Sequence, residues 1–209
     1  TALIAIYIKG SFARREMKKG SDVDIVPIVT ENKYEGKVFG VNSININPVI
    51  VVPLSLWELQ HNKLYSTSDI SPDLRAKPDR FLKKLDTCKL IYGKSLDPSA
   101  FFIREDKQAL KDSIQLAKKG YIPAYLSGKI DFSPLLKEVF WLVELEQNVR
   151  GNKKVEHSFK GISKAVSDKQ HIIHDAYKFR IGEYTSDAMK KAFIIKLKNY
   201  LSELKSSLF

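Results

Sequence analysis

The stretch "YIKGSFARREMKKGSDVDIVPIV", residues 7–29, decides the fold of the first part of this chain. An apolar run ends at Gly10 and Ser11, ten residues separate Ser11 from Asp22, and a second apolar run begins at once after that. A Gly-Ser turn directly after a strand offers backbone N–H groups and a hydroxyl, and a helix that starts there adds its positive end. The pattern therefore predicts a strand, a phosphate-binding corner and a second strand.

Two carboxylates, Asp22 and Asp24, stand at the start of the second apolar run. Residues two apart on a strand project to the same face, so their oxygens can share one or two hard divalent cations. Mg²⁺ is the expected ion, with Mn²⁺ as the alternative. If the two strands lie side by side, a triphosphate at the Gly-Ser corner lies beside the metal, which is the arrangement needed to displace pyrophosphate in line.

These residues resemble the signature of the DNA polymerase β-like nucleotidyltransferase superfamily, in which Gly-Ser, a spacer of about this length and Asp-x-Asp lie at the edge of a sheet. The segment "GSFARREMKKGSDVDIVPIV" is similar to minimal and kanamycin nucleotidyltransferase-like proteins, where Ala-Arg follows Gly-Ser and a serine precedes the first aspartate. The resemblance covers residues 3–29, extends to "LIYGKSL" at 90–96, and is architectural beyond, where a helical domain commonly follows.

The resemblance implies a reaction and a set of site residues. A nucleoside monophosphate, AMP from ATP, would move to a hydroxyl on a small molecule, a protein or RNA. Asp22 and Asp24 would be the catalytic metal ligands. Arg14 would lie near the triphosphate, and Ser21 would support the phosphates or cap the turn. The nucleotide itself would be bound by Gly10, Ser11, Arg14 and Ser21.

One part of the family's site has no counterpart in the sequence. The resemblance implies a third carboxylate on a later strand, but the corresponding segment "VNSININPVIVVP" holds no acid. Asn45 and Asn47 occupy the expected positions; an amide oxygen can coordinate a metal but carries no charge and cannot act as a base. The nearest later acid, Glu58, falls in "LSLWELQ", which predicts a helix with Glu58 in solvent.

Two classes of function follow from this departure. The first is a magnesium-dependent nucleotidyltransferase. The second is a weakened transferase domain that binds a nucleotide or a partner, as an antitoxin or regulator would. The acid pair favours the enzyme, because two adjacent carboxylates repel each other unless a cation lies between them. The missing third acid favours the binding module.

The pattern of apolar residues changes near residue 95. Before it, short apolar runs bounded by Gly, Pro, Asn and Asp predict strands at "ALIAIYI", "VDIVPIV", "INPVIVVP" and "CKLIYG". After it, helical periodicity dominates. We therefore expect an α+β fold: a small mixed β-sheet nucleotidyltransferase domain at 1–95, and an α-helical bundle domain at 96–209, with "DPSAFF" as the linker.

Capping signals place the expected helices. One helix is predicted to begin at Ser133 and Pro134 and to end before Gly151, and another to stop or bend at Gly120 and Pro123. A further helix after Thr185 is predicted from an apolar stripe. Its members are Met189, Phe193, Ile194, Leu197, Leu201 and Leu204.

Composition bounds the class of protein. The 209 residues carry a net charge of +11, of which residues 61–209 hold +10. Such a surplus would attract nucleic acid, nucleotides or an acidic protein, although scattered lysines also fit a solvated helical surface. The single cysteine, Cys88, excludes a disulfide within the chain, and no run approaches the roughly 18 apolar residues of a membrane span. We expect a cytoplasmic protein without a membrane partner, and an incomplete N-terminus because the chain begins with Thr1.

Two other motifs are interpreted as structural. His171, His174 and Asp175 fall at helical spacing, but lack a further partner at metal-ligand spacing and are interpreted as helix-surface residues. Arg150 and His157 loosely resemble the Arg-x-His motif of HEPN ribonucleases. Because Gly151 would break the helix that should present that motif, we interpret it as a chance match.

Overall fold

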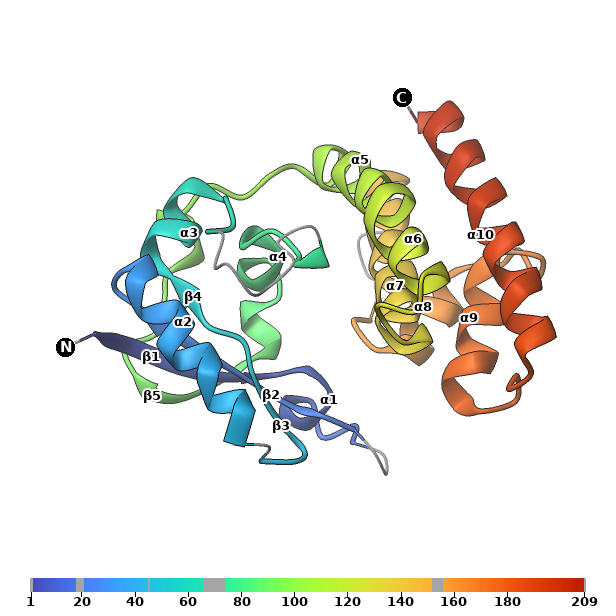
Figure 1. Cartoon of the computed structure of the whole chain (residues 1–209). Helices are drawn as coiled ribbons and strands as arrows, with labels where there is room; N and C mark the ends of the chain where they lie inside the picture. Colours follow the sequence, from blue (N-terminus) through green and yellow to red (C-terminus); the bar gives the residue numbers. More distant parts are fainter. Residues whose placement is uncertain (1, 18–20, 45, 66–73, 152–155, 209) are drawn as a thin grey trace. The chain divides into compact units, whose positions relative to one another are not determined.

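The computed structural model describes residues 2–17, 21–44, 46–65, 74–151 and 156–208. The chain divides into two compact units, Thr1–Ile103 and Arg104–Phe209, coloured blue to green and green to red in Figure 1. The first combines a sheet with short helices, and the second is helical, so the expected α+β class is confirmed. Among the described residues, no helix combines the length and apolar character needed to cross a membrane.

The first unit is built on a mixed sheet with the strand order β3-β2-β1-β5, and β4 also pairs with β2. β1 is antiparallel to both β2 and β5, whereas β3 and β4 are parallel to β2. Each of the four apolar runs identified in the sequence supplies a strand. The strands are β1 (Leu3–Lys9), β2 (Val23–Val29), β3 (Val49–Val51), β4 (Leu54–Ser55) and β5 (Lys89–Gly93).

Short helices connect these strands. Most have one or two turns, as expected for segments rich in Gly, Asn and Pro. The α-helices are α1 (Gly10–Ala13), α2 (Glu35–Phe39), α3 (Leu56–His61) and α4 (Asp79–Leu82). The 3₁₀ turns are η1 (Asn32–Tyr34), η2 (Gly40–Ile44), η4 (Leu85–Thr87) and η5 (Pro98–Ala100).

Buried residues of β1 and β2 form the core of the first unit. Ala5, Tyr7, Val26 and Ile28 are buried and pack against residues of α3 and α4. The Tyr7 hydroxyl accepts a hydrogen bond of 2.7 Å from the backbone N–H of Leu96. The unit continues to residue 103, beyond the expected boundary at 95, because the chain after β5 still packs on this core. The packed residues there are Leu96, Phe101 and Ile103.

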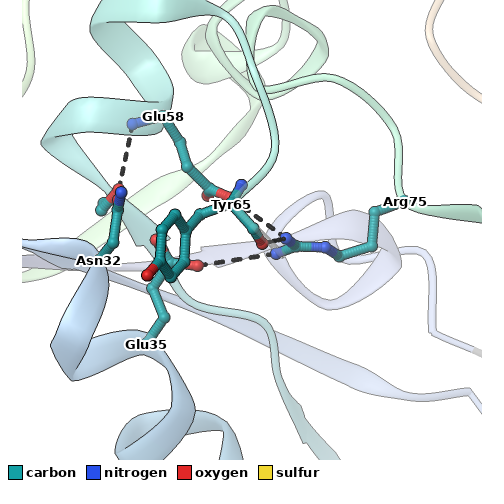
Figure 2. A network of polar contacts seen from close by, with 6 residues as sticks. Asn32, Glu35, Glu58, Tyr65 and Arg75 are labelled. Carbon is teal, nitrogen blue, oxygen red and sulfur yellow. Dashed lines mark hydrogen bonds and ion pairs between the residues drawn. The ribbon is translucent and has the colours of Figure 1, made fainter. Parts of the chain in front are cut away.

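A buried charge network ties α2 and α3 to the following segment (Figure 2). Glu58 lies on α3 with no exposed surface, so its expected exposure to solvent is wrong. Its Oε1 accepts hydrogen bonds from the Tyr65 backbone N–H at 2.6 Å and from Arg75 Nη2 at 3.1 Å. Glu35 Oε2 lies 3.8 Å from Arg75 Nη1. Two buried carboxylates therefore share one guanidinium, which the sequence did not reveal because Arg75 is seventeen residues from Glu58.

Replacing Glu35 by Gln is expected to stabilise the protein at pH 8. Burial, and then the charge of Glu58, raise the pKa of Glu35 from 4.5 to about 7. The folded state therefore holds a proton that the unfolded state releases, and the free energy of unfolding contributed by Glu35 falls as the pH rises from about 4.5 to 7. Glu35→Gln removes that loss, which we expect to be about 3 kcal/mol at pH 8 and near zero at pH 4.

Two measurements test this effect. Urea titrations at several pH values give the free energy of unfolding, and hydrogen exchange of the β1 and β2 amides reports on the first unit. Glu31→Gln is the matched control, because Glu31 is exposed and pairs with exposed Lys33. An equal change in both variants, or a Glu35→Gln gain that does not depend on pH, would contradict the argument.

The second unit is a set of helices around α7. They are α5 (Asp106–Leu116), the π-helical turn η6 (Ala117–Tyr121), α6 (Ile122–Leu126), α7 (Phe132–Val149), α8 (Phe159–Ala165), α9 (Ile172–Ile181) and α10 (Asp187–Leu208). The bend expected at Gly120 and Pro123 is the π-helical turn. α7 begins at Phe132, one residue before the expected cap Ser133. The stripe of α10 is buried except Met189, which is 43% exposed because it lies in the first turn.

Glu146 of α7 joins three elements of the second unit. Its Oε2 accepts a hydrogen bond of 2.8 Å from the Tyr200 hydroxyl and lies 3.3 Å from His171 Nε2, while its Oε1 accepts from Arg150 Nε at 2.9 Å. Burial would raise the pKa of Glu146, but the hydrogen bonds from His171 and Tyr200 outweigh it and lower the pKa. His171 is therefore a capping and packing residue rather than the surface residue expected, because α10 covers it.

Candidate active site

The Gly-Ser corner lies directly against the aspartate pair. Lys9, the last residue of β1, is the register partner of Asp24 on β2. Gly10 follows with φ +78°, and a Cβ added there would lie 2.9 Å from Asp24 Oδ2. Gly10 is thus required twice, for the left-handed backbone and for the space beside the carboxylate. The two halves of the motif, separated in sequence, meet at one end of the β1–β2 pair (Figure 1).

Ser11 lies in α1, which is a single turn. Backbone bonds close it, from Arg14 N–H to Gly10 O at 3.3 Å and from Glu16 N–H to Ser11 O at 2.8 Å. A helix of four residues contributes little dipole, so the positive helix end anticipated from the sequence is weak here. Anion binding at this corner would rest on the backbone N–H groups, the Ser11 hydroxyl and nearby cations.

Asp22 and Asp24 lie at the start of β2, both half-buried. Asp22 immediately precedes the strand, whose first residue, Val23, donates its N–H to Pro48 O at 2.8 Å. Ser21 precedes them and is also half-buried. Asp22 and Asp24 are two residues apart, the spacing at which an extended backbone projects side chains to one face. Their oxygens are the donors that Mg²⁺ and Mn²⁺ prefer, and both side chains keep part of their surface accessible, so these residues fit such an ion.

Arg14, four residues after Gly10, forms an ion pair with an acidic neighbour. Its Nε donates a hydrogen bond of 3.0 Å to Glu16 Oε2, and its side chain is 21% exposed. It also lies near Cys88, the residue before β5: burial raises the pKa of the Cys88 thiol, and the charges of Lys9 and Arg14 oppose that rise. The charges of Arg14 and Lys9 thus both act on the Cys88 thiol.

The neighbouring strand places an apolar residue beside Asp24. In the parallel β2–β3 register, Val23 pairs with Val49, Asp24 with Ile50 and Ile25 with Val51. Register partners share a face, so Ile50, 38% exposed, occupies the position next to Asp24. Asn47 lies in the turn before β3, three residues before Ile50, and is exposed. Asn45, the other candidate ligand, lies outside the described residues.

Other carboxylates do not complete the site. Within residues 2–208, apart from the gaps given above, no three His, Cys, Asp or Glu side chains are grouped so as to hold a metal. Glu58 lies at the far end of β2, because Ser55, whose hydroxyl caps α3 by accepting from the Glu58 N–H, pairs with Val29. Among the described residues, the site therefore offers two carboxylates.

The comparisons with known proteins bear on this arrangement. Residues 3–205 match the family described as "Nucleotidyltransferase domain". The chain belongs to this nucleotidyltransferase family. The expected superfamily membership, with a helical region at the C-terminal end, is thereby confirmed. The match extends through both units, so the helical unit is part of the nucleotidyltransferase architecture.

A solved structure has the same fold. The nucleotidyltransferase chain is similar to the spectinomycin adenyltransferase AAD(9) from Enterococcus faecialis, crystallised with ATP and spectinomycin. The TM-score is 0.58 at 16% sequence identity, over 96% of this chain and 92% of that one. No curated protein sequence matches this nucleotidyltransferase.

Sequence reasoning missed two neighbours of the aspartates, Lys9 and Ile50. Lys9 ends an otherwise apolar strand, and that interruption was a signal. Ile50 carried none, because only the β2–β3 register places it beside Asp24.

Proposed function

We propose that this protein transfers a nucleoside monophosphate, AMP from ATP, to a hydroxyl of a small-molecule acceptor in a reaction that depends on Mg²⁺. The observation that carries the proposal is the proximity of the two halves of the motif, with Asp24 Oδ2 only 2.9 Å from the position that a Cβ on residue 10 would take. Membership in the nucleotidyltransferase family supports it. The likeness to an adenyltransferase crystallised with ATP and spectinomycin favours ATP and a small acceptor.

The proposed roles follow from the positions of the residues. Gly10 and Ser11 hold the triphosphate with Arg14 near its charge, Ser21 supports the turn, and Asp22 and Asp24 hold the ion. A bound divalent ion supplies charge neutralisation and orientation of the phosphates. The acceptor hydroxyl oxygen forms a bond to the α-phosphorus and its proton passes to solvent, while the bond from that phosphorus to the β-phosphate bridging oxygen breaks and pyrophosphate leaves with the electron pair.

Incubation with each labelled nucleoside triphosphate tests the proposal. The wild-type protein, with Mg²⁺ or Mn²⁺ and a panel of hydroxyl-bearing small molecules, is expected to attach label from ATP to an acceptor and to release pyrophosphate. Protein and RNA acceptors in parallel reactions test the other hydroxyl sources. Binding of ATP without transfer to any acceptor would contradict the enzyme and support the binding module.

The binding module is the second candidate, and Ile50 favours it. An isoleucine beside Asp24 can neither coordinate an ion nor take a proton from the acceptor hydroxyl. The basic second unit would then make the partner contact, since it lies within residues 61–209, which carry a net charge of +10. An acidic protein or a nucleic acid is the matching partner.

Ile50→Glu is expected to strengthen the site. The substitution adds a carboxylate on the face of Asp24, at a position exposed enough that the charge is not buried. Mn²⁺ should bind about tenfold more tightly, and transfer should rise by about 10-fold or more, since a positioned base contributes on the order of 10²–10⁴-fold. Calorimetric titration with Mn²⁺ and the labelled-ATP reaction measure the two effects.

Asn47→Glu is the matched control, because it adds the same charge three residues before Ile50, in the turn that leads into β3. A larger gain from Asn47→Glu than from Ile50→Glu would show that the turn, rather than the strand, faces the ion.

A further inference from the structure

A row of side chains crosses the sheet at the Gly-Ser corner. The strand order β3-β2-β1-β5 and the register place Ile50, Asp24 and Lys9 on adjacent strands. Ile8 pairs with Lys89, so the same register continued by one residue sets Cys88 across from Lys9. Register partners project to one face, so this face carries an apolar side chain, a carboxylate, an ammonium and a thiol in sequence.

Lys9 is set close to the aspartate. Directly opposed residues of an antiparallel pair have Cβ atoms about 4.5–5.5 Å apart. Lys9 is half-buried, at the end of a strand whose preceding core-facing residues, Ala5 and Tyr7, are apolar and buried. A lysine at the edge of such a core can pack its stem on the apolar surface while its ammonium stays in contact with water.

We infer that Lys9 is a phosphate-binding residue of this site, which offsets the charge of Asp24 in the empty protein and pairs with the polyphosphate of the bound nucleotide. The inference deepens the proposed function and rests on it for the identity of the nucleotide. Lys9 immediately precedes Gly10 and is the register partner of Asp24, so this residue adjoins the corner assigned to the triphosphate. The site then combines two carboxylates with Lys9, and Arg14 adds a second cation nearby.

This placement predicts effects of opposite sign on two ligands. An ammonium beside Asp24 repels a divalent cation and attracts a polyphosphate. Lys9→Met should therefore bind Mn²⁺ alone more tightly than the wild type, and bind inorganic tripolyphosphate in EDTA at least about tenfold more weakly, the loss of one charge-assisted contact. A purely structural lysine would weaken both or neither.

Lys89→Met is the matched control. Lys89 opens β5, is exposed, and pairs with Ile8, so it projects to the opposite face while carrying the same charge. Its removal should change tripolyphosphate affinity by less than about twofold at 150 mM salt, where exposed charges are screened. Lys9→Arg, which keeps the charge, should retain tripolyphosphate binding and shows whether a loss in Lys9→Met comes from charge or from misfolding.

The experiment is isothermal titration of the full chain and these variants with Mn²⁺ and with tripolyphosphate, beside the labelled-ATP reaction. Equal losses in Lys9→Met and Lys89→Met, unchanged tripolyphosphate affinity in Lys9→Met, or no tripolyphosphate binding by the wild type would overturn the inference. If the wild type transfers nucleotide while Lys9→Met binds tripolyphosphate as tightly as the wild type, the proposed function is retained and the phosphate-binding role of Lys9 is rejected. If tripolyphosphate binding depends on Lys9 but the protein neither binds nor transfers a nucleotide, the phosphate-binding role of Lys9 is retained and the proposed function is rejected.

Discussion

Asp24→Asn is expected to reduce nucleotide transfer by at least about 10³-fold. Asp24 lies two residues after Asp22, its Oδ2 approaches the backbone of Gly10, and it is the register partner of Lys9. A bound metal stabilises transition-state charge by several kcal/mol, and loss of a ligand carboxylate removes much of that stabilisation. Asp22→Asn should act in the same direction, and the double variant should lose little more than either single one, because both act through one ion.

A thermal-shift series separates binding from turnover. Mg²⁺ with ATP should raise the melting temperature of the wild type, since a ligand bound only by the folded state stabilises it. The double variant Asp22→Asn, Asp24→Asn should lose that rise while remaining folded. Glu31→Gln is the control: Glu31 is exposed and lies just beyond the other end of β2. Retention of the full shift and of transfer in the double variant would place the site elsewhere.

Arg75→Met is expected to destabilise the first unit by about 3–5 kcal/mol at pH 8. The Arg75 guanidinium lies within ion-pair distance of two buried carboxylates, those of Glu58 and Glu35. Breaking a buried pair by removing one partner leaves uncompensated charge, and this cost exceeds what the pair itself contributes. The Tyr65 carbonyl also loses its 2.7 Å hydrogen bond from Arg75 Nη2.

The pH dependence identifies the cause. At pH 5 the two glutamates can protonate in the variant, so the cost should be smaller than at pH 8; burial already raises the pKa of both. Hydrogen exchange of the β1 and β2 amides measures the first unit separately from the helical one. Adding Glu58→Gln to Arg75→Met should recover part of the loss. Lys33→Met, which removes an exposed cation paired with Glu31, should cost under about 1 kcal/mol. An Arg75→Met cost that is the same at both pH values would contradict the electrostatic origin.

Local chemistry in the sequence was enough to predict the sheet, the Gly-Ser corner and the aspartate pair. Gly10 needs a positive φ, Asp24 lies on a strand with Asp22 just before it, and short apolar runs bounded by Gly, Pro, Asn and Asp form β1 and β2. Each of these rules acts over a few residues, so it is visible in the order of the amino acids. The helical second unit followed for the same reason, from apolar stripes such as that of α10.

Tertiary structure alone decided which side chains surround those motifs. Parallel pairing of β2 with β3 set Ile50 beside Asp24, antiparallel pairing with β1 set Lys9 there, and the packing of α3 buried Glu58 against Arg75. Register and burial depend on the whole sheet and its covering helices, and a shift of one residue would reverse every face. The sequence determined the chemistry at the corner, whereas the balance of charge around it, two carboxylates with a neighbouring ammonium, was set by strand pairing between segments distant in the chain.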